Sequence, residues 1–155
     1  FFPLSNKLIY SFSGEGVFFY ESIYNNSPKK IFIKNTSSSF IGTGNTKGIP
    51  ELVRNRMLDR LKKYTKRDFI GSAGVETLKM LLNRVNFILH GRVTPWDHYP
   101  LDLLIREAGG EVYMIRDKTK FIYDSYGPLL ATSNITIWNE LSDLILPKVD
   151  SYRIN

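Results

Sequence analysis

The chain has 155 residues, with 21 Lys or Arg against 15 Asp or Glu, so its formal net charge is +6. This length suits one compact domain, and 43% hydrophobic with 23% charged residues excludes an intrinsically disordered chain. The absence of Cys excludes a disulfide framework, a thiolate metal site and a cysteine nucleophile. No apolar run approaches the ~20 residues of a membrane helix, and no signal-peptide pattern opens the sequence. We therefore expect a soluble cytoplasmic protein.

The chain opens on Phe1-Phe2-Pro3 without an initiator Met. A bulky second residue such as Phe normally prevents removal of the Met. We therefore expect that Phe1 is not the natural start and that further sequence of the same protein lies upstream.

The positive charge allows two interpretations. A basic chain with 14% aromatic residues is compatible with nucleic-acid binding. The cations are spread along the chain, however, and most lie beside apolar positions of predicted helices, as on a solvated face. Attraction of a phosphorylated small molecule would need the same sign of charge.

Residues 1–48 are rich in strand patterns. Residues 7–12 and 17–20 are β-rich runs joined by the Gly-containing loop 13–16, which predicts a hairpin. Two further strands are expected at 30–34 and 39–43, followed by a loop at 44–48.

Strands and helices alternate over residues 49–147. The apolar spacing predicts, in order, a helix over 50–61, a strand ending at 69–70, an apolar helix stripe at 75–82, a strand at 85–89, a helix at 101–108, strands at 111–115 and 129–132, and a helix at 138–145. Gly109-Gly110 should cap the third helix, and Pro147 should end the fourth. This alternation predicts an α/β fold with a mainly parallel sheet and helices on both faces.

The first unusual strand-to-helix junction is Gly71-Ser72-Ala73. Small residues let a ligand approach the backbone, and free N–H groups at a helix start attract anions or hydroxyls. The junction also fits a simple helix start capped by Ser72. Glu76 comes one position too late for a standard capping box.

The second junction spans residues 91–100 and contains Asp97. Asp97 precedes the apolar stripe, where an N-cap is expected, and its carboxylate could equally hold Mg²⁺. The two histidines of the chain, His90 and His98, are spaced unlike a zinc motif. The sequence contains neither a P-loop nor a Gly-x-Ser-x-Gly nucleophile motif.

Together, Gly71-Ser72-Ala73, Trp96-Asp97 and Glu107-Ala108-Gly109-Gly110 resemble the carboxyl-terminal signature of the inositol monophosphatase family of Mg²⁺-dependent, lithium-sensitive phosphatases. Asp97 lies 26 residues after Gly71 and 10 before Glu107, and both spacings match that family. The resemblance implies that residues 1–147 form the carboxyl-terminal half of a layered α-β-α-β-α sandwich, followed by a tail at 148–155.

The resemblance also implies roles for individual residues. Asp97 would be the catalytic metal ligand, placed near the substrate hydroxyl beside the phosphate. Gly71, Ser72 and Ala73 would line the substrate site through backbone and hydroxyl groups. His90, an expected substrate-binding residue, takes the place at which inositol-specific members carry a glutamate, and this departure weighs against inositol itself as the substrate. The resemblance as a whole implies inositol phosphate or a related small polyol or sugar phosphate.

The other metal ligands of the family, a glutamate and an Asp-Pro-x-Asp segment, belong to its amino-terminal half, and no Asp-Pro-x-Asp occurs here. Two-metal phosphoryl transfer needs several carboxylates. We therefore interpret the chain as the carboxyl-terminal portion of a Mg²⁺-dependent phosphate-monoester hydrolase, inactive without the missing amino-terminal half. The resemblance implies a homodimer. The alternative is a non-catalytic basic homologue that binds RNA or a protein partner.

Overall fold

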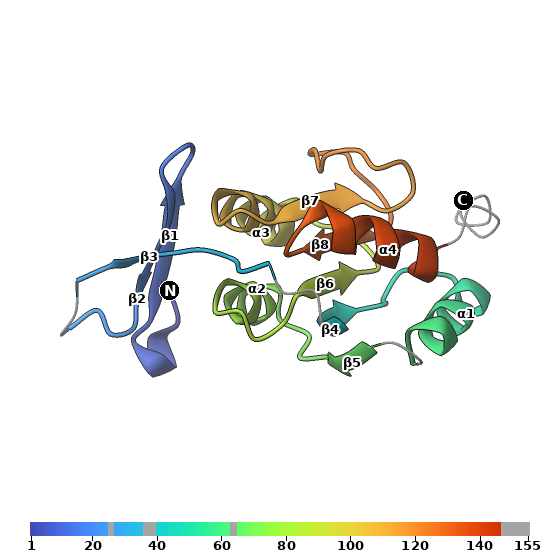
Figure 1. Ribbon diagram of the computed structural model, residues 1–155, viewed down its shortest axis with the longest axis horizontal. Coiled ribbons are helices and arrows are strands. Elements are labelled where there is room, and N and C mark those ends of the chain that lie inside the picture. The colour runs from blue at the N-terminus through green and yellow to red at the C-terminus, as the bar shows by residue number, and fades with distance from the viewer. Residues whose placement is uncertain (25–26, 36–39, 63–64, 147–155) are drawn as a thin grey trace.

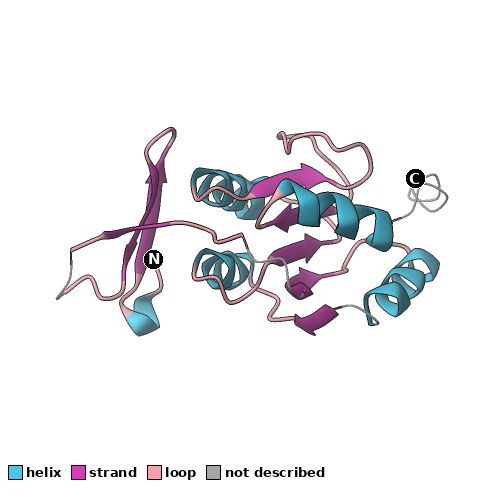
Figure 2. Ribbon diagram, viewed as in Figure 1, coloured by secondary structure: helices cyan, strands magenta, loops and turns pink. Residues whose placement is uncertain are grey.

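The computed structural model describes residues 1–24, 27–35, 40–62 and 65–146, which form four layers (Figures 1 and 2). A three-stranded sheet comes first, then a helix pair, a five-stranded sheet and a second helix pair. The elements are η1 (Pro3–Ser5), β1 (Leu8–Phe12), β2 (Gly16–Tyr20), β3 (Lys29–Ile31), β4 (Phe40–Asn45), α1 (Glu51–Lys62), β5 (Thr65–Asp68), α2 (Ala73–Leu81), β6 (Phe87–His90), α3 (Pro95–Glu107), β7 (Glu111–Met114), β8 (Leu129–Thr132) and α4 (Ile135–Ile145).

The predicted hairpin is confirmed as β1 and β2, and β3 pairs antiparallel with β2 to complete the first sheet. Its inner face carries Val17, which packs with Leu81 of α2 and with Ala108 at the end of α3. The hairpin loop is held to α3 by Glu107, whose carboxylate accepts hydrogen bonds from the backbone N–H groups of Gly14 (2.7 Å) and Gly16 (2.9 Å). The first sheet is therefore fastened to the helix layer by both packing and hydrogen bonds.

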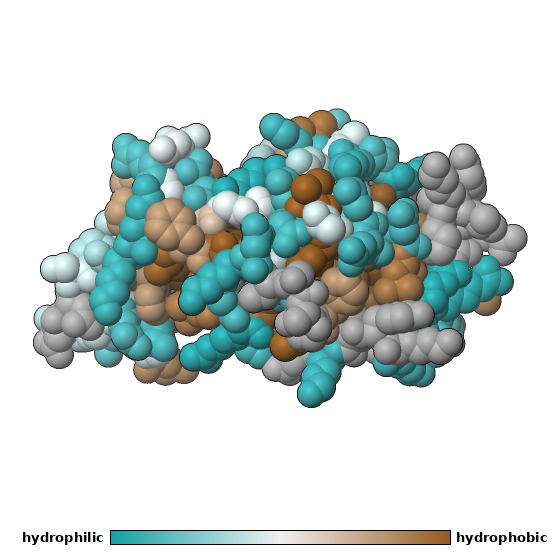
Figure 3. Space-filling model, viewed as in Figure 1, coloured by the Kyte–Doolittle hydropathy of each residue, from teal (hydrophilic) through white to brown (hydrophobic). Residues whose placement is uncertain are grey.

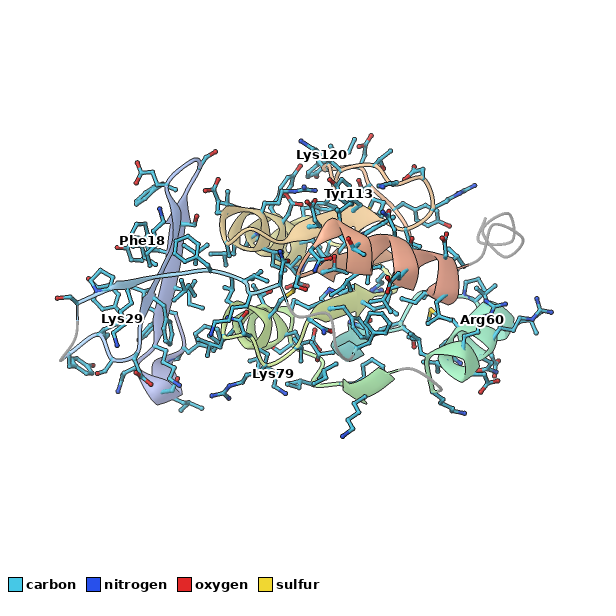
Figure 4. All side chains as sticks on the ribbon, in the orientation of Figure 1. Phe18, Lys29, Arg60, Lys79, Tyr113 and Lys120 are labelled. Carbon is cyan, nitrogen blue, oxygen red and sulfur yellow. The ribbon has the colours of Figure 1, made fainter. Side chains whose placement is uncertain are left out.

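The other face of the first sheet is aromatic. Tyr10 and Phe18 stack with ring centroids 5.3 Å apart, and the Lys30 Nζ lies 5.8 Å from the Phe18 centroid. Figure 4 shows Phe18 on the side of this sheet that faces away from α2 and α3. Phe12 and Phe32 are 61% and 59% exposed, and apolar side chains are visible on this part of the surface in Figure 3. An exposed aromatic sheet face of this kind is typical of an interaction surface.

The second sheet has the strand order β5-β4-β6-β8-β7. β4 is parallel to β5 and β6, whereas β8 is antiparallel to both β6 and β7. Four strands therefore run in one direction and β8 runs against them, which confirms the expected mainly parallel sheet.

Helices cover both faces of this sheet, as expected. α2 and α3 lie on one face and α1 and α4 on the other (Figure 1). All four residues of β6 are buried, and alternate side chains enter the two cores. Phe87 and Leu89 pack with α1 and α4, and Ile88 packs with α2 and α3. This two-sided burial explains why β6 has no alternating polar pattern.

The predicted helices form, but α3 begins earlier than its apolar stripe suggests. Thr94 is the N-cap and Pro95 the first helical residue, a position where the missing proline N–H costs nothing. Asp97 is thus in the first turn, and the interpretation of Asp97 as the N-cap is wrong. Pro100 lies inside the helix. Gly109 has φ +91° directly after the helix, which confirms the expected glycine cap.

The boundaries elsewhere differ slightly from the sequence predictions. Gly44 and Asn45 extend β4 into the predicted loop, and β4 joins the second sheet although it lies within the strand-rich segment 1–48. Pro147 and the predicted tail 148–155 lie outside the described residues. Within the described part of the chain, every helix is too short or too polar to cross a lipid bilayer.

Gly42 of β4 provides a test of this packing. A Cβ added there would lie 1.9 Å from the Cζ of Phe87, whereas a Cβ at Gly74 of α2 would meet nothing within 4 Å. We expect Gly42→Ala to lower the free energy of unfolding by about 1–3 kcal/mol through overpacking. Gly74→Ala, the matched control, should leave it unchanged or raise it by up to ~1 kcal/mol. Urea unfolding measures both, and an unchanged midpoint for Gly42→Ala would contradict the packing of β4 against β6.

Candidate active site

The carboxyl ends of β4 and β6 lie side by side, with Asn45 paired to His90 in the parallel register. The turn before α2 and the first turn of α3 adjoin these strand ends. A cavity of about 130 Å³ lies at this meeting point. Its lining residues are Asn45, Lys47, Gly71, Ala73, His90, Arg92, Thr94, Asp97 and His98. Ligand sites in α/β folds occur at this edge of the sheet.

Asp97 reaches this cavity from the first turn of α3. Its side chain is exposed, and its Oδ2 accepts a hydrogen bond of 2.9 Å from the Thr94 hydroxyl. Asp97 lines the same cavity as Gly71 and Ala73. The structure therefore brings together the two junctions that the sequence singled out.

The turn before α2 presents its backbone to the cavity. Gly71 has φ +77°, a conformation that favours glycine, and a Cβ there would meet nothing within 4 Å. Ser72 occupies the N-cap position, but its side chain makes no capping hydrogen bond. Gly71 and Ala73 line the cavity on either side of Ser72.

Three buried polar side chains form a hydrogen-bonded group at this cavity: His90 and His98 line it, and Glu76 is not one of its described lining residues. The Glu76 Oε2 is 2.7 Å from the His90 Nε2, and the His90 Nδ1 is 2.8 Å from the His98 Nε2. Their exposed fractions are 0%, 1% and 4% respectively. The Glu76 Oε1 also accepts a hydrogen bond from the Gly71 N–H, at 3.1 Å. Both ring nitrogens of His90 thus face protein partners.

The local environment shifts the pKa values of two members of this group. Burial by itself raises the pKa of Glu76, but the hydrogen bond with His90 and those from the Gly71 and Ile70 amides outweigh it and lower that pKa below 4.5. Burial, together with the neighbouring His90, lowers the pKa of His98. Glu76 is therefore ionised and His98 neutral at neutral pH.

Two basic residues border the cavity. Lys47 follows β4 and Arg92 follows β6, and both side chains are exposed. Within the described ranges, neither forms a salt bridge. These cations create an environment that attracts an anionic ligand.

Asp97 fits a metal ligand, but only as part of a larger donor set. Among the residues whose placement is described, no group of three or more His, Asp or Glu side chains could hold a metal ion. Mg²⁺ in proteins is commonly bound by one or two carboxylates, with water and substrate phosphate as further ligands. An exposed carboxylate with free lone pairs at the cavity meets one part of that requirement.

Comparison with known proteins identifies the family. The sequence model of the inositol monophosphatase family matches residues 1–153. The chain belongs to the inositol monophosphatase family. This match confirms the resemblance seen in the sequence. The relatives in this family are phosphatases.

A curated relative and two solved structures show the extent of the match. The chain is 27% identical over 111 residues to the fructose-1,6-bisphosphatase/inositol-1-monophosphatase of Thermotoga maritima, covering 71% of this chain and 40% of that protein. The inositol monophosphatase of Anabaena sp. has 25% identity and a TM-score of 0.72, over 92% of this chain and 56% of that one. Inositol monophosphatase II of Staphylococcus aureus has 16% identity and a TM-score of 0.78, over 97% and 56%, which supports the fold alone. The chain spans about half the length of these relatives.

The sequence, through the family resemblance, indicates the Gly71 turn, His90 and Asp97 as site residues. Gly71, Ala73, His90 and Asp97 line the cavity, whereas Ser72 is not among its described lining residues. Glu76 stands out in the sequence only as misplaced for a capping box, and His98 only as a poor zinc ligand. The one local signal is the absence of a capping role for Glu76, because a carboxylate in a first helical turn needs some other partner when it is buried. The cavity residues that no sequence pattern indicates are Asn45, Lys47, Arg92 and Thr94.

The buried carboxylate predicts a pH-dependent stability. A lowered pKa means that Glu76 contributes stability above about pH 4.5, and that this contribution is lost as the pH falls through its folded-state pKa. We expect Glu76→Gln to lower the free energy of unfolding at pH 7 by about 2–3 kcal/mol, because an amide cannot replace both charged hydrogen bonds. The difference from the native protein should shrink progressively as the pH falls below about 4.5. Urea unfolding at pH 7 and over a series of acidic pH values, with the exposed Glu140→Gln as control, measures this, and a difference independent of pH would contradict it.

Proposed function

We propose that the chain supplies part of the active site of a Mg²⁺-dependent phosphate-monoester hydrolase, which acts on inositol phosphate or a related small polyol or sugar phosphate. The observation that carries the proposal is the convergence of Asp97 and the Gly71 turn on one cavity. Membership of a phosphatase family supports the reaction class. The metal and the substrate are part of the proposal.

In this proposal Asp97 holds one divalent cation. Bound metal would polarise the phosphate and activate water for attack on phosphorus. Thr94 orients the Asp97 carboxylate through its hydroxyl, leaving the other oxygen available. The remaining carboxylate ligands would come from residues beyond these 155, since Asp97 is the only carboxylate among the lining residues that the structure describes.

The turn Gly71-Ser72-Ala73 and His90 form the proposed substrate surface. The open side of Gly71 lets a ligand approach the backbone closely. His90 contributes the wall of the cavity through its ring, because both of its nitrogens already have protein partners. A cavity of about 130 Å³ is smaller than the ~300–1,000 Å³ of typical ligand sites. It suits a phosphate group and the atoms next to it, with the rest of the site completed by further protein.

The exposed aromatic face of the first sheet supports the same conclusion. Phe12 and Phe32 expose more than half of their surface, which is costly unless another layer covers them. We propose that the partner is the remaining half of the same fold, within a cytoplasmic protein that forms a homodimer. The comparisons give no support to the alternative of a non-catalytic RNA-binding or protein-binding homologue, which stays a prediction.

The first test concerns Asp97 in the full-length protein. We expect Asp97→Asn to reduce Mg²⁺-dependent phosphate release by about 100-fold or more, since removal of one preorganised charge-stabilising group costs on that order. The fold should remain, because asparagine keeps an oxygen that can accept the Thr94 hydrogen bond. Asp143→Asn on α4, an exposed position, is the control. Full activity of Asp97→Asn would remove this residue from the mechanism.

A second test concerns Arg92, one of the two basic residues that line the cavity. Arg92→Gln should raise the KM for a phosphate monoester about threefold to tenfold with a smaller effect on kcat, because an exposed cation adds attraction for the bound anion. The matched control is Arg84→Gln, since Arg84 precedes β6 and Arg92 follows it. Steady-state kinetics at low ionic strength measure the split. Equal KM values for the two variants would show that Arg92 does not contact substrate.

A further inference from the structure

A continuous hydrogen-bonded chain connects the two segments that form the cavity. It runs from the Gly71 N–H through Glu76, His90 and His98 to the backbone of Thr94. The Thr94 hydroxyl then donates to Asp97. α2, β6 and α3 each contribute one of the three side chains, so the connection is tertiary rather than local.

Only one direction of donation along this hydrogen-bonded network gives every donor an acceptor and every acceptor a donor. The ionised Glu76 carboxylate accepts from the Gly71 N–H and from the His90 Nε2–H. A proton on the His90 Nδ1 would donate to the His98 Nε2 and move the His98 proton to its Nδ1, which could then not accept from the Thr94 N–H. In the direction that satisfies Thr94, the His90 Nδ1 is therefore unprotonated and accepts from the His98 Nε2–H. This leaves the His98 Nδ1 free to accept from the Thr94 N–H, at 3.0 Å.

The opposite direction satisfies fewer groups. The His98 Nδ1 also lies 2.9 Å from the Thr94 carbonyl oxygen, to which a protonated Nδ1 could donate. That oxygen already accepts from the backbone N–H of His98, at 3.0 Å. A protonated Nδ1 would therefore leave the Thr94 N–H without its acceptor, and an unpaired amide in a partly buried position is costly.

From this geometry we infer that Glu76 and His98 are positioning residues of the site. They hold both imidazoles as Nε2–H tautomers and fix the Gly71 turn relative to Thr94 and Asp97. The coupling itself stands on the contacts alone, whereas its effect on phosphate release rests on the proposed function. A group that only filled space behind the cavity would carry no such coupling between Glu76 and Thr94.

The tautomers are directly measurable because the chain contains only two histidines. Long-range ¹H–¹⁵N correlation spectra of the protein at pH 8 should show, for both rings, a protonated Nε2 and an unprotonated Nδ1. The signals of the two rings are assigned with His98→Gln. An Nδ1–H tautomer at either ring in the native protein would overturn the inference.

Glu76→Gln tests whether a change at Glu76 alters the tautomers of His90 and His98 and, through them, the hydrogen bond of the Thr94 N–H. A glutamine amide pointing at His90 donates to its Nε2, which forces His90, and then His98, into the Nδ1–H form. The Thr94 N–H consequently loses its acceptor, and we expect its hydrogen exchange to rise about tenfold. The control Glu140→Gln should leave that exchange unchanged. Unaltered His98 tautomer and Thr94 exchange in Glu76→Gln would show that Glu76 acts only locally.

A pair of substitutions at His98 provides an independent test if Glu76→Gln does not fold. In His98→Gln the introduced amide would still offer an N–H to the His90 Nδ1, whereas the leucine of His98→Leu, of similar size, would not. We expect His98→Gln to keep His90 in the Nε2–H form and to retain a larger share of kcat than His98→Leu, with similar KM values for both. Equal kcat values for the two variants would assign His98 a purely space-filling role.

Failure of the proposed function would give a different result. If the protein released no phosphate, the tautomer and exchange measurements would still report the coupling. If the coupling were absent, Asp97→Asn would still reduce phosphate release by about 100-fold or more, while Glu76→Gln affected only stability. The two sets of measurements therefore separate the two ideas.

Discussion

A carboxylate without contact with solvent constrains the whole site. Glu76 is fully buried, and a buried charge of this kind persists only when hydrogen bonds compensate for the lost hydration. Its partners, Gly71 and His90, lie at the start of α2 and the end of β6. Satisfying one carboxylate thus fixes a turn, a strand end and, through His98, the first turn of α3. The cavity is the outer surface of this arrangement.

The sheet topology makes that arrangement possible. β4 and β6 are parallel neighbours, so their carboxyl ends meet at one edge and place Asn45 beside His90. β5 is also parallel to them, so α2, which follows β5, and α3, which follows β6, both start beside the same edge. α2 and α3 lie between the two sheets and pack against both of them. The Glu107 carboxylate also holds the β1–β2 hairpin to α3. The helix layer that carries Asp97 is therefore supported from two directions.

Local patterns predict most of this fold, whereas tertiary pairings are beyond them. The hairpin, the helices and the cap at Gly109 follow from spacing and glycine chemistry within a few residues. The apolar stripe misplaces the start of α3, because Thr94 and Pro95 set that start upstream of the stripe. The sequence does not predict the direction of β8, because the connection from Met114 of β7 to Leu129 of β8 is long enough to allow either direction. Family resemblance, rather than periodicity, points to Asp97 and Gly71. The partnership of Glu76 with His90 joins residues on separate elements, which no periodicity records.

The cavity is lined by residues from one limited stretch of the sequence, and this has a consequence for the order of folding. Its described lining residues fall between Asn45 and His98, within successive strand–turn–helix units. The pairing of Asn45 with His90 closes a loop of 45 residues, about half the separation of Glu107 from Gly14 and Gly16, and the entropy lost on loop closure grows with loop length. Contacts between near neighbours in sequence also form faster than distant ones. Assembly of this pocket should accordingly precede docking of the amino-terminal hairpin, whose anchor at Glu107 lies more than 90 residues away.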